Sequence, residues 1–216
     1  RANMHDELLQ RHLELVLEAN KKTNITRISS WDEGMVLHVQ DSLLGLEELS
    51  EAPDGWYADI GTGAGYPGIP LAIETGRKTL LVDSVGKKTA ILDSFIGELG
   101  LDQVSTYTGR IEDLAREHPY EFTAITARAL AQLSVLMELA APLLQLGGRL
   151  ICYKANLKPS ELDHALSLQD TVGLKLVSDR SFVLDDYQRR IVTFEKVKRE
   201  SIQLPRKTGL AQKRPL

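Results

Sequence analysis

Apolar and polar residues alternate at helical spacing over the first 50 residues. Five apolar side chains fall on one face of a helix expected at residues 4–20, namely Leu8, Leu9, Leu13, Val16 and Leu17. A second helix is expected at residues 31–49, where Ser30 is the candidate N-cap and Glu33 stands at capping-box spacing. Residues 1–52 are therefore predicted to form an N-terminal helical cap and not a separate domain.

From residue 56 onward, short apolar runs typical of strands alternate with helical patterns. Strands are expected at 56–60, 78–83, 103–109, 122–128 and 147–154. Helices are expected between them at 67–75, 87–99, 111–117 and 130–145. Two later strands, 175–184 and 189–197, are joined by a short turn. This order predicts an α/β, Rossmann-like fold with a doubly wound, mostly parallel, seven-stranded sheet over residues 56–197.

Composition fits one globular domain spanning residues 1–216. Hydrophobic residues make up 43% and charged residues 26%, which is ordinary for a soluble protein. No apolar run approaches the roughly 18 residues that a membrane span needs, and the polar N-terminus is unlike a signal peptide. A single cysteine, Cys152, excludes an internal disulfide framework. We therefore expect a cytoplasmic protein with no membrane partner.

Charge is distributed unevenly along the chain. The net charge is −4, yet the last 21 residues hold seven Lys or Arg and one acid, Glu200. A basic C-terminal tail (residues 198–216) on an acidic body can mark a contact with a polyanion. A tail that is simply solvated is the alternative that charge alone leaves open.

The first strand runs into a glycine-rich turn that can be aligned in two ways. Counted from Gly63, the sequence is a literal G-x-G-x-x-G dinucleotide fingerprint, but two residues separate that glycine from the strand. Counted from Gly61, an apolar strand ends at Asp59-Ile60 and G-x-G-x-G follows, as in enzymes that bind S-adenosylmethionine (SAM). SAM carries a sulfonium and an ammonium group, and we expect the Asp59 carboxylate beside them.

Acids after the next two strands fit the nucleoside part of such a cofactor. Asp83 ends the second strand about 20 residues after Gly61, a spacing that suits two ribose hydroxyls in either cofactor class. Ile111 and Glu112 follow the third strand, where an apolar side chain and an acceptor can flank adenine. For Glu112, a stabilising interaction with the helix dipole is the alternative.

The segment after the fourth strand narrows the range of methyl-transfer reactions that the sequence supports. It reads "TARAL" and lacks the Asn/Asp-Pro-Pro-aromatic segment of many amino-group methyltransferases. Cys152 lies in an apolar strand, where a free cysteine usually acts as a small buried hydrophobe and not as a nucleophile. Transfer to a ring nitrogen such as guanine N7 fits what remains, because N7 carries no proton and needs positioning but no general base.

Eight segments in order resemble the RsmG (GidB) ribosomal RNA methyltransferases. They are "NKKTNIT", "HVQDSL", "DIGTGAGYPGIPLAI", "LVDSVGKKTAIL", "GRIEDL", "TARAL", "GGRLICYK" and "LPRKTGLAQKRPL". The resemblance extends from about residue 18 to the C-terminus. It implies a class I, SAM-dependent fold and transfer of a methyl group to N7 of a guanine in the decoding-centre loop of 16S rRNA. The implied partner is that rRNA or the 30S particle, with no metal.

The resemblance also implies roles for individual residues. It places Gly61, Tyr66, Ile111, Glu112 and Arg128 at the cofactor, to which the sequence pattern adds Asp59, Gly63 and Asp83. For Arg128, position at the end of the fourth strand leaves three partners open: the cofactor carboxylate, an RNA phosphate or a structural ion pair.

It further places His38 and Asp41, an i,i+3 pair, at the mouth of the active site. Lys154 is a candidate for contact with an RNA phosphate or the guanine edge, and His38, Asp41 and Lys154 are the candidate catalytic residues. The same reasoning gives an RNA-binding arm that is separable from SAM binding, made of Arg206, Lys207, Lys213 and Arg214.

Two rival functions remain open at this point. A nicotinamide-dependent oxidoreductase is supported by the shifted glycine alignment alone. A non-catalytic SAM-binding or RNA-binding module is the other.

Overall fold

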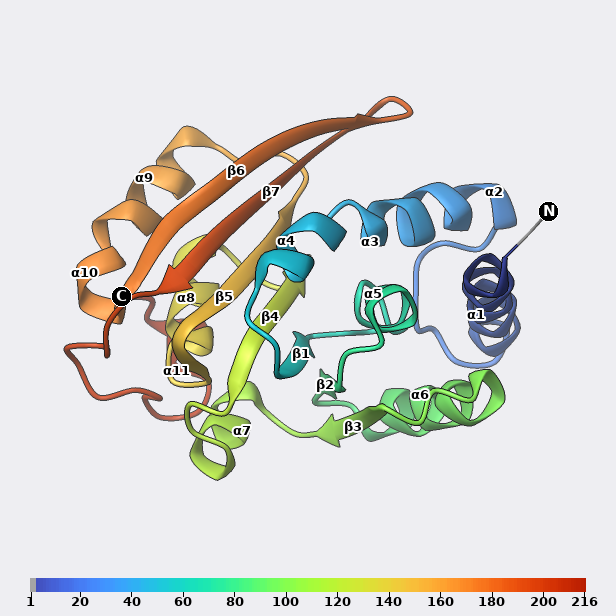
Figure 1. The fold of residues 1–216 in the computed structure, drawn as a ribbon, viewed down its shortest axis with the longest axis horizontal. Coiled ribbons are helices and arrows are strands. Elements are labelled where there is room, and N and C mark those ends of the chain that lie inside the picture. The colour runs from blue at the N-terminus through green and yellow to red at the C-terminus, as the bar shows by residue number, and fades with distance from the viewer. Residues whose placement is uncertain (1–2) are drawn as a thin grey trace.

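A seven-stranded sheet forms the centre of the computed structural model, which describes residues 3–216 (Figure 1). Its strands lie in the order β3-β2-β1-β4-β5-β7-β6. The strands are β1 Trp56–Ile60, β2 Thr79–Asp83, β3 Val104–Thr108, β4 Phe122–Arg128, β5 Leu144–Lys154, β6 Leu174–Leu184 and β7 Tyr187–Lys196. The first five pair in parallel, whereas β7 is antiparallel to both of its neighbours. The predicted doubly wound, mostly parallel sheet is confirmed.

Helices cover both faces of the sheet. Alternate strand residues point to opposite faces, so Ala58 and Ile60 join one apolar cluster and Tyr57 joins another. The helices are α1 Met4–Asn20, α2 Trp31–Gly34, α3 Asp41–Leu43, α4 Leu46–Glu51, α5 Gly68–Thr75, α6 Gly86–Leu99, α7 Ile111–Glu117, α8 Leu133–Ala140, α9 Pro159–Ser167, α10 Gln169–Val172 and α11 Leu210–Lys213. Helices α7, α8 and α9 pack on the first face, and α5 and α6 pack on the second.

The N-terminal helices cap one side of the core as predicted. Helix α1 packs on α5 and α6 through Leu9, Leu13 and Val16. The Ser30 hydroxyl accepts a hydrogen bond from the Glu33 amide at 3.3 Å, which confirms the expected N-cap. The second helical segment differs from expectation, because Met35–Gln40 forms a π-helical turn, η1. Such turns are frequent at functional sites, and this one carries His38.

Helix α8 is shorter than the pattern predicted. Residues 141–146 are apolar enough to extend a helix, but Leu144 pairs with Phe122 and belongs to β5. At the other end, Ala129 adopts a left-handed conformation with φ 53°, which ends β4 and keeps residues 129–132 out of the helix. A loop thus follows β4 at the point where strand order reverses, and ligands bind at that point in doubly wound sheets. Among residues 3–216, the longest apolar helix falls short of what crossing a bilayer requires.

Candidate active site

The turn between β1 and α5 depends on glycine for its conformation and for space. Gly61 and Gly63 have φ of +67° and +57°, which side chains other than glycine rarely adopt. A Cβ at Gly61 would lie 2.8 Å from Leu130, whereas a Cβ at Gly63 would meet no atom within 4 Å. The turn therefore leaves open space above Gly63. Strand β1 ends at Ile60, before the first glycine of the Gly61 alignment.

Asp59 lies beneath this turn, and its place differs from expectation. It is fully buried, and one carboxylate oxygen accepts hydrogen bonds from the Thr62 hydroxyl (2.7 Å) and the Gly68 amide (2.9 Å). The other oxygen accepts from the Thr126 hydroxyl at 2.8 Å. Burial raises the pKa of Asp59 to about 6. The carboxylate thus holds the turn and the start of α5 in place and has no exposed surface of its own; its expected position beside the cationic groups of SAM stays a prediction.

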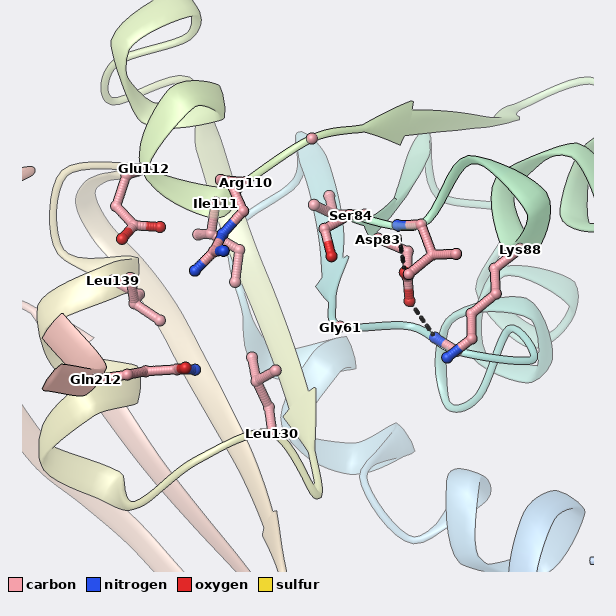
Figure 2. A pocket seen from close by; sticks show the side chains of 14 residues that line it. Gly61, Asp83, Ser84, Lys88, Arg110, Ile111, Glu112, Leu130, Leu139 and Gln212 are labelled. Carbon is pink, nitrogen blue, oxygen red and sulfur yellow. Dashed lines mark hydrogen bonds between the residues drawn. The ribbon is translucent and has the colours of Figure 1, made fainter. Parts of the chain in front are cut away.

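Asp83 presents its carboxylate to a pocket of about 390 Å³, the glycine-loop pocket (Figure 2). One oxygen accepts from the Gly63 amide (3.2 Å) and the other from the Val85 amide (3.0 Å). A carboxylate has about four acceptor sites, so each oxygen retains capacity for a ligand hydroxyl. The pocket is lined by Gly61, Gly63, Val82, Asp83, Ser84, Val85, Lys88, Gly109, Arg110, Ile111, Glu112, Leu130, Leu139 and Gln212. Four of the expected cofactor residues besides Asp83 are thus brought together: Gly61, Gly63, Ile111 and Glu112.

Glu112 is tied to the C-terminal tail. Its carboxylate is almost fully buried, and one oxygen accepts a hydrogen bond from the Gly209 amide at 2.8 Å. This contact takes one of about four acceptor sites of the carboxylate, and the expected hydrogen bond from an adenine amine stays a prediction. Glu112 therefore connects the pocket wall to the tail.

A second pocket, of about 650 Å³, lies on the other side of the β4 end; we term it the arginine pocket. Ala129 lines it, while the next residue, Leu130, lines the glycine-loop pocket. Its lining residues are Thr26, Arg27, Ile28, Leu37, His38, Asp41, Arg128, Ala129, Tyr153, Lys154, Ala155 and Arg189. Neighbouring residues of the loop after β4 thus line different pockets, and three of the expected active-site residues, His38, Asp41 and Lys154, line the second.

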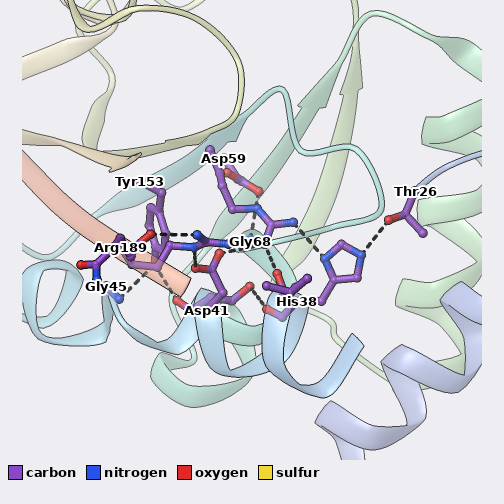
Figure 3. A network of polar contacts seen from close by, with 12 residues as sticks. Thr26, His38, Asp41, Gly45, Asp59, Gly68, Tyr153 and Arg189 are labelled. Atoms are coloured by element: carbon purple, nitrogen blue, oxygen red, sulfur yellow. Dashed lines mark hydrogen bonds and ion pairs between the residues drawn. The ribbon is translucent and has the colours of Figure 1, made fainter. Parts of the chain in front are cut away.

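Asp41 joins two arginines at the centre of the arginine pocket. Its carboxylate accepts from Arg128 at 3.0 Å and from Arg189 at 2.7 Å (Figure 3). Arg128 also donates to the Leu37 carbonyl (2.8 Å) and to His38 Nδ1 (3.0 Å). Arg128, which we had expected at the cofactor, is therefore held among groups of the N-terminal cap.

His38 is a neutral hydrogen-bonding link. Because a guanidinium can only donate, Nδ1 must be the acceptor, and Nε2 carries the proton that is donated to Thr26 Oγ1 at 2.8 Å. Burial and the charge of Arg128 lower the pKa of His38 to about 3. His38 is therefore fixed as the acceptor that orients Arg128, and in this arrangement both ring nitrogens are engaged.

Tyr66 is placed between two histidines. Its ring stacks on His12 at 4.3 Å and on His38 at 4.2 Å between centroids, and it is nearly fully buried. His12 Nε2 donates to the carbonyl of Ala64, inside the glycine turn, at 3.0 Å. Tyr66 thus supports the turn from beneath and does not form an exposed wall of the glycine-loop pocket. Sequence reasoning missed His12, because 52 residues separate it from Ala64.

Burial of His12 is expected to lower the free energy of unfolding at mildly acidic pH. Burial lowers its pKa from 6.5 to about 4. Between those values the unfolded chain binds the proton more readily than the folded chain, so stability decreases as pH falls from about 6.5. His38 acts in the same direction, and Asp59, whose pKa is raised by burial, acts in the opposite direction.

The variant His12→Gln keeps a donor for Ala64 but does not titrate. Between pH 7 and pH 5 we expect it to lose about 2 kcal/mol less stability than the unsubstituted protein. Urea unfolding at both pH values measures this. Equal losses of unfolding free energy in the two proteins would contradict a contribution of His12 to this pH dependence.

The ammonium group of Lys154 forms an ion pair with an acidic side chain. Its ammonium lies 2.8 Å from the Glu161 carboxylate and donates to the Ala131 carbonyl at 3.2 Å. Glu161 in turn accepts from the Leu133 amide at 3.0 Å. Lys154 lines the arginine pocket as expected, but in this structure it fixes the loop after β4.

The C-terminal tail is packed on the core, contrary to the expected separable arm. Arg206 forms two hydrogen bonds of 2.7 Å with Glu138 of α8, whose side chain is 3% exposed. Arg206 is therefore a structural cation in this arrangement. Lys207, Lys213 and Arg214 are exposed, and within residues 3–216 their charged groups pair with no acid.

The described part of the chain contains neither a group of side chains arranged to bind a metal ion nor an exposed thiol. Residues 3–216 contain no group of three or more His, Cys, Asp or Glu side chains arranged to hold a metal ion. Cys152 is buried in β5, and burial raises the pKa of its thiol to about 12. A thiol with so high a pKa is a poor nucleophile at neutral pH, in agreement with the structural role expected for Cys152.

Known structures share the fold. Geranyl diphosphate C-methyltransferase from Streptomyces coelicolor superposes with a TM-score of 0.61 at 14% identity, covering 73% of this chain and 78% of that one. The YcgJ protein of Bacillus subtilis superposes with a TM-score of 0.58 at 14% identity, covering 76% and 100%. Together with the antiparallel β7 and the glycine turn, these similarities define a class I, SAM-dependent methyltransferase fold.

Sequence comparison identifies the family within that class. The model of the family GidB, described as rRNA small subunit methyltransferase G, matches residues 5–198. A ribosomal RNA small subunit methyltransferase G of Streptococcus gordonii is 37% identical over 212 residues, covering 96% of this chain and 90% of the relative. A protein of the same name from Fervidobacterium nodosum is 32% identical and covers 97% and 98%. The chain belongs to the rRNA small subunit methyltransferase G family, which confirms the resemblance.

Proposed function

We propose that this protein transfers a methyl group from SAM to N7 of a guanine in the decoding-centre loop of small-subunit (16S) rRNA. The observation that carries the proposal is the pair of pockets on either side of the β4 end. One offers glycine backbone and an acid, and the other offers a cluster of arginines. Relatives over nearly the full chain are named for methylation of small-subunit rRNA.

The glycine-loop pocket fits the methyl donor. A Cβ at Gly63 would project into open space beside Asp83, so glycine here leaves room for a ligand. Asp83 has acceptor capacity for two hydroxyls, and Ile111, Leu130 and Leu139 provide apolar surface for a flat ring. When bound, SAM would supply an electrophilic methyl group. These residues would hold its nucleoside portion.

The arginine pocket fits a nucleophile that needs no deprotonation. The two described side chains that are most able to take a proton there, His38 and Asp41, already accept hydrogen bonds from arginine. Guanine N7 carries a lone pair and no proton, so a pocket built for positioning is sufficient. Arg128 and Arg189 would also attract the phosphates of the substrate.

Exposed cations favour RNA as the partner. Arg27 is exposed where it lines the arginine pocket, and Lys207, Lys213 and Arg214 lie on the surface of the tail. Lysine and arginine side chains that neutralise phosphates supply most of the non-specific binding energy for nucleic acids. Naked rRNA and the 30S particle both present such phosphates.

Methyl transfer tests the proposal. The protein is incubated with methyl-labelled SAM and unmethylated small-subunit rRNA, either free or in 30S particles, and the labelled nucleotide is mapped by mass spectrometry. We expect one labelled guanine, carrying the methyl group on N7. Binding of SAM without transfer to either substrate would favour a non-catalytic module, and stabilisation by NAD but not by SAM would favour an oxidoreductase.

A further inference from the structure

Gln212, in the C-terminal tail, forms part of the glycine-loop pocket. It lies in α11 and lines the cavity, although 73 residues separate it from Leu139, the lining residue nearest to it in the sequence. Figure 2 shows its side chain extending into the pocket beside Leu139, on the side opposite Asp83 and Lys88. The tail therefore contributes a polar group to the site where the nucleoside of the methyl donor would bind.

Two contacts hold Gln212 in this position. The Gly209 amide donates to Glu112 at 2.8 Å, immediately before α11. Ala211 is buried against Val135 and Leu139 of α8. These contacts on either side of the turn into α11 fix the backbone from which the Gln212 side chain extends.

Arg206 anchors the start of the same segment. Its two 2.7 Å hydrogen bonds to Glu138 attach the tail to α8, and it also donates to the Arg214 carbonyl at 2.7 Å. The loop between Arg206 and Arg214 is thus closed at both ends. The position of Gln212 is set by the fold and not by a free terminus.

The side chains around Gln212, together with its own amide, are complementary to a purine base. Ile111, Leu130 and Leu139 offer apolar surface on the same side of the pocket. Gln212 is exposed at the pocket, and none of the side-chain hydrogen bonds among residues 3–216 uses its amide, so the amide is available to a ligand. An amide offers one acceptor and a donor side by side. Adenine presents the complementary pair at its edge, an exocyclic amine next to a ring nitrogen, and glutamine recognises it in this way in nucleic-acid complexes.

The geometry points to Gln212 as a specificity-determining residue that reads the adenine edge of the methyl donor, with Glu112 as the residue that positions it. This inference rests on the proposed function, because it requires an adenosine-containing cofactor in the glycine-loop pocket. It gives the C-terminal tail a role in cofactor recognition in addition to its exposed cations.

Binding calorimetry with two ligands tests the inference. The first is S-adenosylhomocysteine, and the second is its purine-riboside analogue, which lacks the exocyclic amine. For the unsubstituted protein we expect loss of the amine to weaken binding about tenfold. For Gln212→Ala the two ligands should bind within about twofold of each other, since the group that accepts from the amine is gone. Gln212→Glu keeps an acceptor and should retain the preference.

Lys213→Ala is the matched control, because it changes the next residue of the same short helix and should keep the tenfold preference. An unchanged preference in Gln212→Ala would overturn the role of Gln212 while leaving the proposed function intact. Failure of the unsubstituted protein to bind S-adenosylhomocysteine would overturn both. Circular dichroism of each variant verifies that the fold is retained.

Discussion

Replacing Asp83 with alanine is expected to weaken binding of SAM by about 1,000-fold, because two hydrogen bonds from the ribose to a charged acceptor are lost. Asp83 stands at the end of β2, and its two oxygens accept from the backbone amides of Gly63 and Val85. The variant therefore also removes the group that holds the glycine turn against the neighbouring loop. Both effects reduce affinity for the same ligand.

Calorimetry with SAM and with S-adenosylhomocysteine measures the effect. Asp83→Asn keeps one acceptor oxygen and should fall between the alanine variant and the unsubstituted protein. Asp93→Ala is the control, since Asp93 lies in α6, accepts from Thr106 and does not line the pocket. A dissociation constant for Asp83→Ala within threefold of the unsubstituted value would rule out the ribose assignment.

Truncation before Leu204 is expected to reduce both stability and SAM binding. It leaves the buried Glu138 carboxylate without Arg206, and breaking such a pair costs about 3 kcal/mol. It also exposes the α8 surface that Ala211 covers and removes the Gly209 amide from Glu112. We therefore expect cofactor binding to require the tail, whereas the sequence alone predicted that the two are separable.

Point variants separate the two parts of the tail. Arg206→Met should lower the free energy of unfolding by about 2 kcal/mol, less than the full cost because Arg206 is partly exposed. Lys207→Met, the exposed neighbour, should leave stability unchanged within about 0.5 kcal/mol but reduce the salt dependence of RNA binding. Urea unfolding and titration with small-subunit rRNA measure these effects. Equal stability of the two variants would show that the Arg206–Glu138 pair is not structural.

The sequence predicted the sheet well because each strand is a local signal. All seven strands were expected within three residues of their observed ends, since short apolar runs between turn residues reflect burial on both faces. The glycine turn was predicted for the same reason, because positive φ and close approach restrict those positions to glycine. The expected acid at the end of β2 lies in the pocket. Helices α9, α10 and α11 were missed, as they carry no long periodic pattern.

The structural roles of the remaining site residues depend on contacts with residues far away in the sequence, which sequence patterns do not reveal. Asp59 was expected to face a cofactor, but three donors from different elements enclose it. Arg189 was not predicted to reach Asp41, because 148 residues separate them. The tail appeared as a solvated or RNA-binding arm because its partner for Arg206, Glu138, lies in a helix 68 residues earlier. No single-sequence pattern encodes such a pair.

A crystal structure with S-adenosylhomocysteine would show whether the methyl donor binds in the pocket between Asp83 and Gln212. We expect both ribose hydroxyls to contact Asp83. We also expect the purine between Ile111 and Leu130, with its amine at Gln212 and the sulfur toward the Arg128 side of the β4 end. A ligand bound elsewhere, or bound here with its ribose away from Asp83, would show that the glycine-loop pocket is not the site of the methyl donor.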